Sequence, residues 1–198
     1  MPWRAARVDR AGTTLTVFVN PPKPGCQTYP SPHASVQESS DVVIVTVTAT
    51  AAPAACERTV VTQFKVTLSQ PLGGRLLRNG RDGVIARAFF DANLPVIPAA
   101  WHEVPTDYIS VDQSSWSIGF TRSGGPDLYF RAEAFRMADP GTVPLGSHKG
   151  VVYPVRQDSY GVRWQVGDLM YSMELMPSEG KTCTQAELEH VISQLTWP

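Results

Sequence analysis

The sequence has few of the features by which a function is usually recognised. Its 198 residues include only three cysteines and four histidines, with no closely spaced cysteine pair of the kind that zinc sites use. No apolar stretch approaches the roughly 20 residues that a membrane-spanning helix needs. The formal net charge of -1 removes the broad attraction to phosphates on which nucleic-acid binding depends. We therefore expect no nucleic-acid partner and no membrane-spanning helix within these residues.

The signature sequences of common enzymes are missing as well. A nucleophile elbow, Gly-x-Ser-x-Gly, does not occur, because 146–150 has the wrong spacing and 157–161 lacks the first glycine. Neither common type of phosphate-binding loop is present. The histidines stand singly along the chain, as surface or interface histidines do. We therefore assign no catalytic residue, no metal ligand and no cofactor from the sequence.

What the sequence does contain is typical of β-sheet. Valine and threonine occur 22 and 16 times, and such stiff, β-branched side chains suit a pleated surface better than a helix. Hydrophobic residues make up 42% and charged residues 18% of the chain, which excludes intrinsic disorder. A chain of this length removes roughly 70% of its unfolded surface from water. We therefore expect a folded protein with a substantial hydrophobic core.

In the first half, alternating apolar and polar residues predict strands at 14–19, 42–48 and 59–68. Apolar residues on both faces of 42–48 favour a central strand covered on both sides, whereas 59–68 has one polar face. Asn79-Gly80 favours a hairpin turn between Leu76-Leu77 and 83–87.

Prolines 95, 98 and 105 mark a boundary near residue 92, which predicts domains at 1–91 and 92–198. The second half has two hairpin strands and a three-stranded meander, at 115–120, 128–135, 150–155, 161–166 and 169–175. Thr184 and Glu187 have the spacing of a capping box before an apolar helical stripe that ends at Leu195. Together these patterns predict an α+β protein, mainly antiparallel β-sheet in two β-rich subdomains with one C-terminal helix.

Cys26 and Cys56 each lie near one end of the predicted 42–48 hairpin. A disulfide between them would close a loop of about 31 residues and stabilise the fold by roughly 3.5 kcal/mol; two buried free thiols are the alternative. A disulfide would indicate an oxidising compartment. The stretch after Met1 lacks a signal core, so either a targeting segment has been removed or the chain is cytosolic. Cys183 precedes a helix start, where its pKa could be lowered, but an inert, partly buried thiol is the simpler interpretation.

Aromatic residues gather on or beside the predicted strands of the second half. They could line a ligand groove, formed above all by Trp101, Trp116, Trp164 and Tyr171. Aromatic residues that alternate along sheets more often form the core, so the core is the favoured interpretation and the groove is the alternative.

Distinctive stretches of the first half are 12–17, Cys26, 36–43, Cys56 and Pro71-Leu-Gly-Gly-Arg75. Together they resemble, over about residues 7–88, a domain of uncharacterised extracytoplasmic, lipoprotein-type proteins of actinobacteria. This resemblance implies that Cys26 and Cys56 form a disulfide. More loosely, 94–101 and the Trp- and Tyr-bearing hairpin before the last helix are similar to other extracytoplasmic domains. The resemblance implies a location and a fold, and no catalytic residues.

We expect a non-catalytic, extracytoplasmic binding or interaction module, whose partner is an unknown protein or small molecule. Any attachment to a membrane would be through an anchor that has been removed. One alternative is a small hydrolase assembled from distant residues, for which Ser159, His148 and Asp158 are the candidates. A sensor or regulatory ectodomain is the other.

Overall fold

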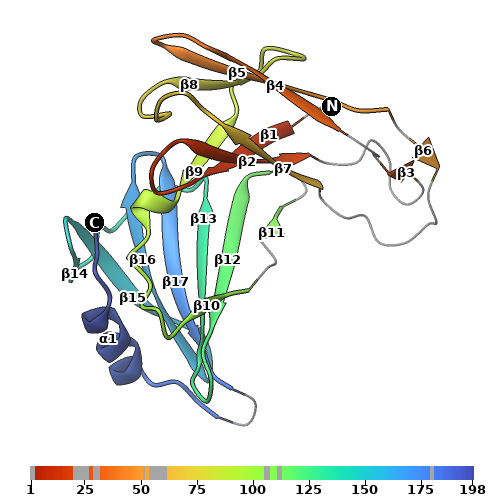
Figure 1. The fold of residues 1–198 in the computed structure, drawn as a ribbon. Helices are drawn as coiled ribbons and strands as arrows, with labels where there is room; N and C mark the ends of the chain where they lie inside the picture. Colours follow the sequence, from red (N-terminus) through yellow and green to blue (C-terminus); the bar gives the residue numbers. More distant parts are fainter. Residues whose placement is uncertain are drawn as a thin grey trace. The chain divides into compact units, whose positions relative to one another are not determined.

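The structure is a computed structural model, and it describes residues 3–19, 27–28, 32–50, 52–53, 62–104, 108–110, 113–178 and 181–198 (Figure 1). The chain divides into two compact units. Unit 1 comprises Met1–Ala92 with Val111–Gln113, and unit 2 comprises Asn93–Ser110 with Ser114–Pro198. A short 3-10 helix, Asp91–Asn93, lies at the division. Cys26 and Cys56 lie outside the described residues, so their predicted disulfide stays a prediction.

Unit 1 contains two main sheets. The first has the order β7-β2-β1-β9, built from Thr62–Thr67, Thr14–Val19, Trp3–Val8 and Arg87–Phe90. The second has the order β4-β5-β8, built from His33–Glu38, Val42–Thr48 and Leu76–Asn79. A separate two-stranded ribbon pairs β3, Gln27–Thr28, with β6, Ala52–Pro53.

The two main sheets of unit 1 share one hydrophobic core. Side chains of β1, β2 and β7 pack in a single cluster with Val43, Val45 and Val47 of β5. Trp3 has no exposed surface, and its indole Nε1 donates to the backbone oxygen of Val45, 3.3 Å away. Buried Asn79 donates in turn to the backbone oxygen of Trp3, 3.1 Å away, so the two sheets are joined by polar as well as apolar contacts.

The structure corrects the sequence interpretation of unit 1 in three respects. β5 is central in its sheet, but only its Val43, Val45 and Val47 face is fully buried, so it is not covered on both sides. The turn at Asn79-Gly80 is followed by one isolated antiparallel bridge, from Arg78 to Ile85, rather than by a full hairpin. β8 pairs in parallel with β5 of the second sheet, whereas β9 pairs in parallel with β1 of the first sheet. The two strands on either side of the turn therefore belong to different sheets.

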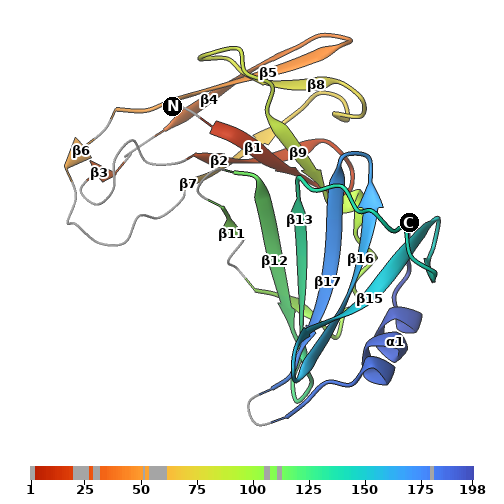
Figure 2. The same ribbon diagram turned by 180° about the vertical axis from the view of Figure 1, so that it is seen from behind.

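Unit 2 is a single antiparallel sheet with the order β10-β12-β13-β17-β16-β15-β14, and β11 also pairs with β12 (Figure 2). The strands are His102–Glu103, Tyr108–Ile109, Ser115–Thr121, Asp127–Glu133, Val143–Leu145, His148–Arg156, Ser159–Val166 and Leu169–Met176, numbered β10 to β17 in chain order. The predicted hairpin and meander are confirmed. Gly167, with φ of +61°, makes the tight turn between the last two strands.

The one α-helix among the described residues is α1, Gln185–Gln194, which packs against β16. The predicted capping box is present: Thr184 Oγ1 accepts from the backbone N–H of Glu187 at 3.2 Å, and Glu187 Oε2 accepts from the N–H of Thr184 at 2.7 Å. Leu188, Val191 and Ile192 form its buried stripe. No described helix has the length and apolar character to cross a bilayer. The described part of the chain is mostly β-sheet, and its single α-helix lies near the C-terminal end.

Candidate functional site

The four aromatic residues of the candidate groove lie inside unit 2. Trp116, Trp164 and Tyr171 have no exposed surface, and Trp101 is 8% exposed. The rings of Trp164 and Tyr171 stack at 5.8 Å between centroids, and Tyr171 Oη accepts from Asn93 Nδ2 at 2.9 Å. Trp116, Trp164 and Tyr171 have no exposed surface and cannot touch a ligand unless the core opens, so they form core in this structure. Trp101 keeps a small exposed surface and lies against Arg122.

The candidate hydrolase residues are not assembled. Ser159 is fully buried at the start of β16, and its Oγ has no hydrogen-bond partner among the described residues. His148 begins β15, whose other end, Arg156, pairs with Ser159. Eight residues of strand place the imidazole about 26 Å away along the strand. A serine needs an imidazole within hydrogen-bond reach to act as a nucleophile, so this triad is excluded.

Cys183, the described free cysteine, is buried with 5% of its surface exposed. Burial raises the pKa of its thiol, and the carboxylates of Glu187 and Asp158 raise it further. This agrees with the inert, buried thiol that the sequence favoured, and not with a pKa lowered by the helix start. The thiol stays protonated at neutral pH and is a weak nucleophile.

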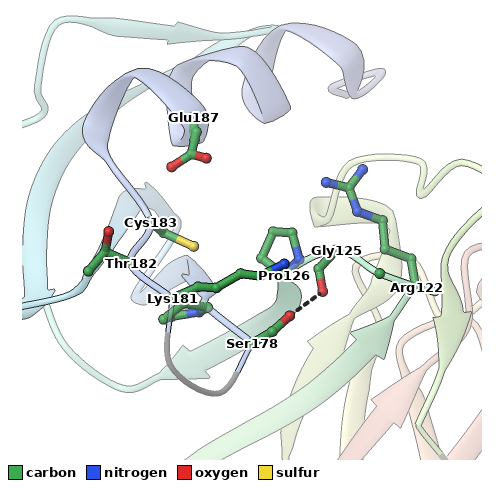
Figure 3. Close-up of a pocket in the computed structure, with 10 residues that line it drawn as sticks. Arg122, Gly125, Pro126, Ser178, Lys181, Thr182, Cys183 and Glu187 are labelled. Carbon is green, nitrogen blue, oxygen red and sulfur yellow. Dashed lines mark hydrogen bonds between the residues drawn. The ribbon is translucent and has the colours of Figure 1, made fainter.

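A pocket of about 200 Å³ lies at the end of the unit 2 sheet where β12 turns into β13 and the chain passes from β17 to α1 (Figure 3). Its described lining comes from those two segments: Arg122, Gly124, Gly125, Pro126, Pro177, Ser178, Lys181, Thr182, Cys183 and Glu187. Ser178 Oγ donates to the backbone oxygen of Gly125 at 3.0 Å, which ties the two segments together. At the liquid volume of about 30 Å³ per molecule, this space corresponds to about six or seven waters.

Arg122 is held in place by its neighbours. Its guanidinium carbon lies 4.3 Å from the centroid of the Trp101 ring, a cation–π contact. Gly125 passes so close that a Cβ there would lie 2.1 Å from Arg122 Nε, so a side chain at this position would require the arginine to shift. Nε itself is buried and has no hydrogen-bond partner among the described residues. The arginine is thus positioned by packing, while its hydrogen-bonding capacity is unused by the described chain.

The other two charged groups of the pocket are Glu187, which is hydrogen-bonded, and Lys181, which is not. Glu187 accepts from Thr184 through the capping box, and this backbone hydrogen bond lowers the pKa of its carboxyl, so the group is ionised at neutral pH. The ammonium group of Lys181 makes neither a hydrogen bond nor an ion pair with the described residues. Figure 3 shows the Cys183 sulfur pointing between Glu187 and Lys181.

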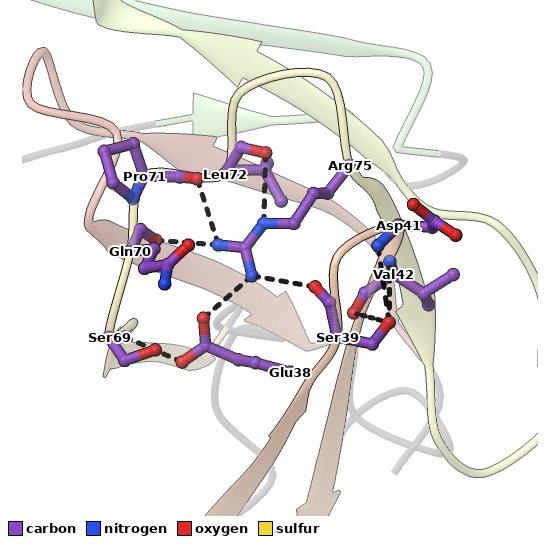
Figure 4. A network of polar contacts seen from close by, with 9 residues as sticks. All are labelled: Glu38, Ser39, Asp41, Val42, Ser69, Gln70, Pro71, Leu72 and Arg75. Atoms are coloured by element: carbon purple, nitrogen blue, oxygen red, sulfur yellow. Dashed lines mark hydrogen bonds and ion pairs between the residues drawn. The ribbon is translucent and has the colours of Figure 1, made fainter.

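A second polar cluster lies in unit 1 and accounts for the Pro71-Leu-Gly-Gly-Arg75 stretch (Figure 4). Arg75 donates to the backbone oxygens of Gln70 at 2.7 Å and Pro71 at 3.0 Å, and to Glu38 Oε2 at 2.9 Å. Glu38 also accepts from the N–H of Ser69 at 2.7 Å. The arginine thus fastens the 69–75 loop to the β4–β5 hairpin, and its donors are already used within the fold.

No known protein family matches the chain, and neither a curated protein nor a solved structure is significantly similar to it. Among the described residues, no three His, Cys, Asp or Glu side chains are grouped so that they could hold a metal ion. The pocket of unit 2 is therefore the candidate functional site on its own geometry. The sequence interpretation missed it; the Gly124-Gly125 pair before Pro126 lies in its lining.

Proposed function

We propose that the protein is a non-catalytic binding module that works outside the cytoplasm and takes a small ligand in the pocket of unit 2. The observation that carries this proposal is Arg122, whose guanidinium is fixed over Trp101 while its donors are unused by the described residues. Ligand sites combine such fixed polar groups with a concave surface. A well-positioned but unused arginine on a cavity wall is therefore best explained by a bound ligand.

Binding is favoured over catalysis by the state of the other pocket groups. The Cys183 thiol has a raised pKa, which makes it a poor nucleophile. Glu187 has a lowered pKa and is tied to Thr184, which makes it a poor general base. The pocket therefore combines two cationic side chains, Arg122 and Lys181, with two groups that are poorly suited to proton or group transfer. This combination favours a protein that binds a small molecule over one that transforms it.

The extracytoplasmic location is supported by sequence alone: the resemblance to actinobacterial lipoprotein-type domains, and Cys26 and Cys56 as the disulfide that the resemblance implies. It is tested by alkylating the unfolded protein with and without reductant and mapping the modified peptides by mass spectrometry. We expect alkylation of Cys183 alone without reductant, and of all three cysteines with it. Three alkylated cysteines in the unreduced sample would remove the argument for an oxidising compartment.

The binding function is tested by a screen of small metabolites, using ligand-observed NMR with wild-type protein. Compounds that bind are then compared on Arg122→Gln and on Arg136→Gln, a matched change of an exposed arginine beyond the opposite end of β13. We expect binders to be weakened by the first change and unaffected by the second. A screen without binders, or binders indifferent to every pocket substitution, would refute a ligand site here. Turnover of a screened compound, lost in the pocket variants, would refute a non-catalytic role.

A further inference from the structure

We infer that the pocket of unit 2 recognises the anionic end of its ligand, a carboxylate or phosphoryl group, through Arg122 and Lys181. This inference rests on the proposed function, because it names the ligand class of the same site. It depends on three properties of the pocket: how the guanidinium is presented, the balance of charge, and the available space.

The orientation of Arg122 suits a ligand with two oxygens. The guanidinium carbon lies 4.3 Å from the centroid of the Trp101 ring, and the N–H donors of a guanidinium lie in the plane of the group. Gly125 shields Nε, which leaves the terminal nitrogens as the donors a ligand can reach. A planar fork of donors matches the oxygens of a carboxylate or phosphoryl group, and such charge-assisted bonds are about twice as strong as neutral ones.

The charges of the pocket favour an anion. Arg122 and Lys181 supply two positive charges and Glu187 one negative charge, so the lining carries a net charge of about +1. The Glu187 carboxylate already accepts from the N–H and the Oγ1 of Thr184, at 2.7 and 3.0 Å. A cationic ligand would have to compete with these bonds, whereas an anion would meet two cationic groups that make no side-chain hydrogen bond or ion pair with the described residues.

The size and rim of the pocket limit what lies within it. Its 200 Å³ is below the roughly 300–1,000 Å³ of pockets that enclose drug-sized molecules, so it holds one small group rather than a whole cofactor. Pro126 and Pro177 stand on its two wall segments, and proline fixes the backbone φ of each. The backbone is thus restricted at one position on each wall segment.

The test is a titration of the full chain with sodium phosphate and, separately, sodium acetate, at constant ionic strength set by sodium chloride. Backbone amide resonances of Gly124, Gly125, Lys181 and Thr182 report on the pocket in ¹H–¹⁵N spectra. We expect saturable shifts at these amides with at least one anion. Tighter binding of phosphate would indicate a phosphoryl ligand, and tighter binding of acetate would indicate a carboxylate ligand.

Two pocket variants and two controls make the result specific. Arg122→Gln and Lys181→Gln should each weaken binding by about tenfold, as expected for loss of a charge-assisted hydrogen bond. Arg136→Gln and Lys149→Gln remove exposed cations at the other end of the sheet and should leave the dissociation constant within about twofold. Because Arg122 also packs on Trp101, Lys181→Gln provides an answer even if Arg122→Gln unfolds the protein.

The inference fails if neither anion shifts the pocket amides, or if the control variants weaken binding as much as the pocket variants. Its failure can be told apart from failure of the proposed function. If a neutral compound from the metabolite screen shifts the same amides, the binding function stands and only the anionic ligand class is wrong. If neither the anions nor any screened compound shifts them, both are wrong.

Discussion

Arg75 Nη1 donates to Glu38 Oε2 at 2.9 Å, and this contact joins two turns of unit 1 that are far apart in the sequence. Figure 4 shows the guanidinium surrounded by acceptors from both turns. A lysine at this position keeps the charge but cannot reach the same set of acceptors. We expect Arg75→Lys to lower the free energy of unfolding by about 2 kcal/mol, because the backbone oxygens of Gln70 and Pro71 lose their donor.

Urea denaturation of wild type and Arg75→Lys measures this change, with Arg81→Lys as the matched control. Arg81 is exposed, and its side chain makes no hydrogen bond or ion pair with the described residues. The control should unfold at the wild-type urea concentration. An equal loss in both variants would mean that the Arg75 network does not stabilise the fold.

The same network makes stability depend on pH through Glu38. The N–H of Ser69 and the guanidinium of Arg75 hold the pKa of this carboxyl below its ordinary value of 4.5. Because the folded pKa is the lower one, the stabilisation is present above about pH 4.5 and is lost as pH falls through the folded pKa. We expect Glu38→Gln to be less stable than wild type at pH 7.

This stability gap should narrow below pH 4.5, since the protonated carboxyl of the wild type then resembles the amide of the variant. Urea denaturation of both proteins at intervals from pH 7 to pH 3 gives the gap directly. A gap that stays constant over the whole interval would show that the ionised carboxylate is not what stabilises the two turns.

Elements whose signal is local could be predicted from the sequence. β13 alternates with a period of two, as does β2 over its first four residues, and the Thr184–Glu187 box marks the start of α1. β1 was missed because its alternation is broken: Ala5 and Ala6 are both buried, and the pairing shifts between Trp3 and Ala5. A bulge removes the pattern by which a strand is recognised.

Features that join distant residues could not be predicted. The parallel pairing of Ala5 with Arg87 depends on which sheet the chain enters after a turn, and no local pattern fixes that choice. The same holds for the pocket, since Arg122 and Lys181 become neighbours only when β13 pairs with β17. Trp164 and Tyr171 illustrate the limit: the sequence indicates aromatic residues on strands, and only the register shows that they pack against each other in the core.

The Tyr153 ring lies over Gly161 on the neighbouring strand, and its hydroxyl donates to Glu174 Oε1 at 3.1 Å. A Cβ at Gly161 would lie 3.0 Å from the tyrosine ring and 2.9 Å from the backbone oxygen of Met173. We expect Gly161→Ala to destabilise the protein by about 1–3 kcal/mol, because the ring must move off the strand.

Thermal unfolding of Gly161→Ala measures this cost, and Gly74→Ala is its control. Gly74 has open space around its would-be Cβ and no positive φ, so alanine there should be neutral or slightly stabilising. The double variant Gly161→Ala with Tyr153→Ala should recover part of the loss by removing the crowded ring. If Gly161→Ala unfolds at the wild-type temperature, Tyr153 does not rest on this glycine.

Thr184 caps α1, so its loss should lower the stability of the protein. Thr184→Ala removes the Oγ1 acceptor for the N–H of Glu187, and we expect the free energy of unfolding to fall by about 1 kcal/mol. Thr184→Ser keeps the acceptor and should restore stability. Thr182→Ala is the matched control, because Thr182 is exposed nearby and its hydroxyl caps nothing.

Urea denaturation gives the free energy of unfolding of each of the three variants, and hydrogen exchange at the amides of 185–188 localises the effect. Faster exchange there in Thr184→Ala alone is the expected result, whereas unchanged exchange would show that the capping box does not hold the first turn of α1.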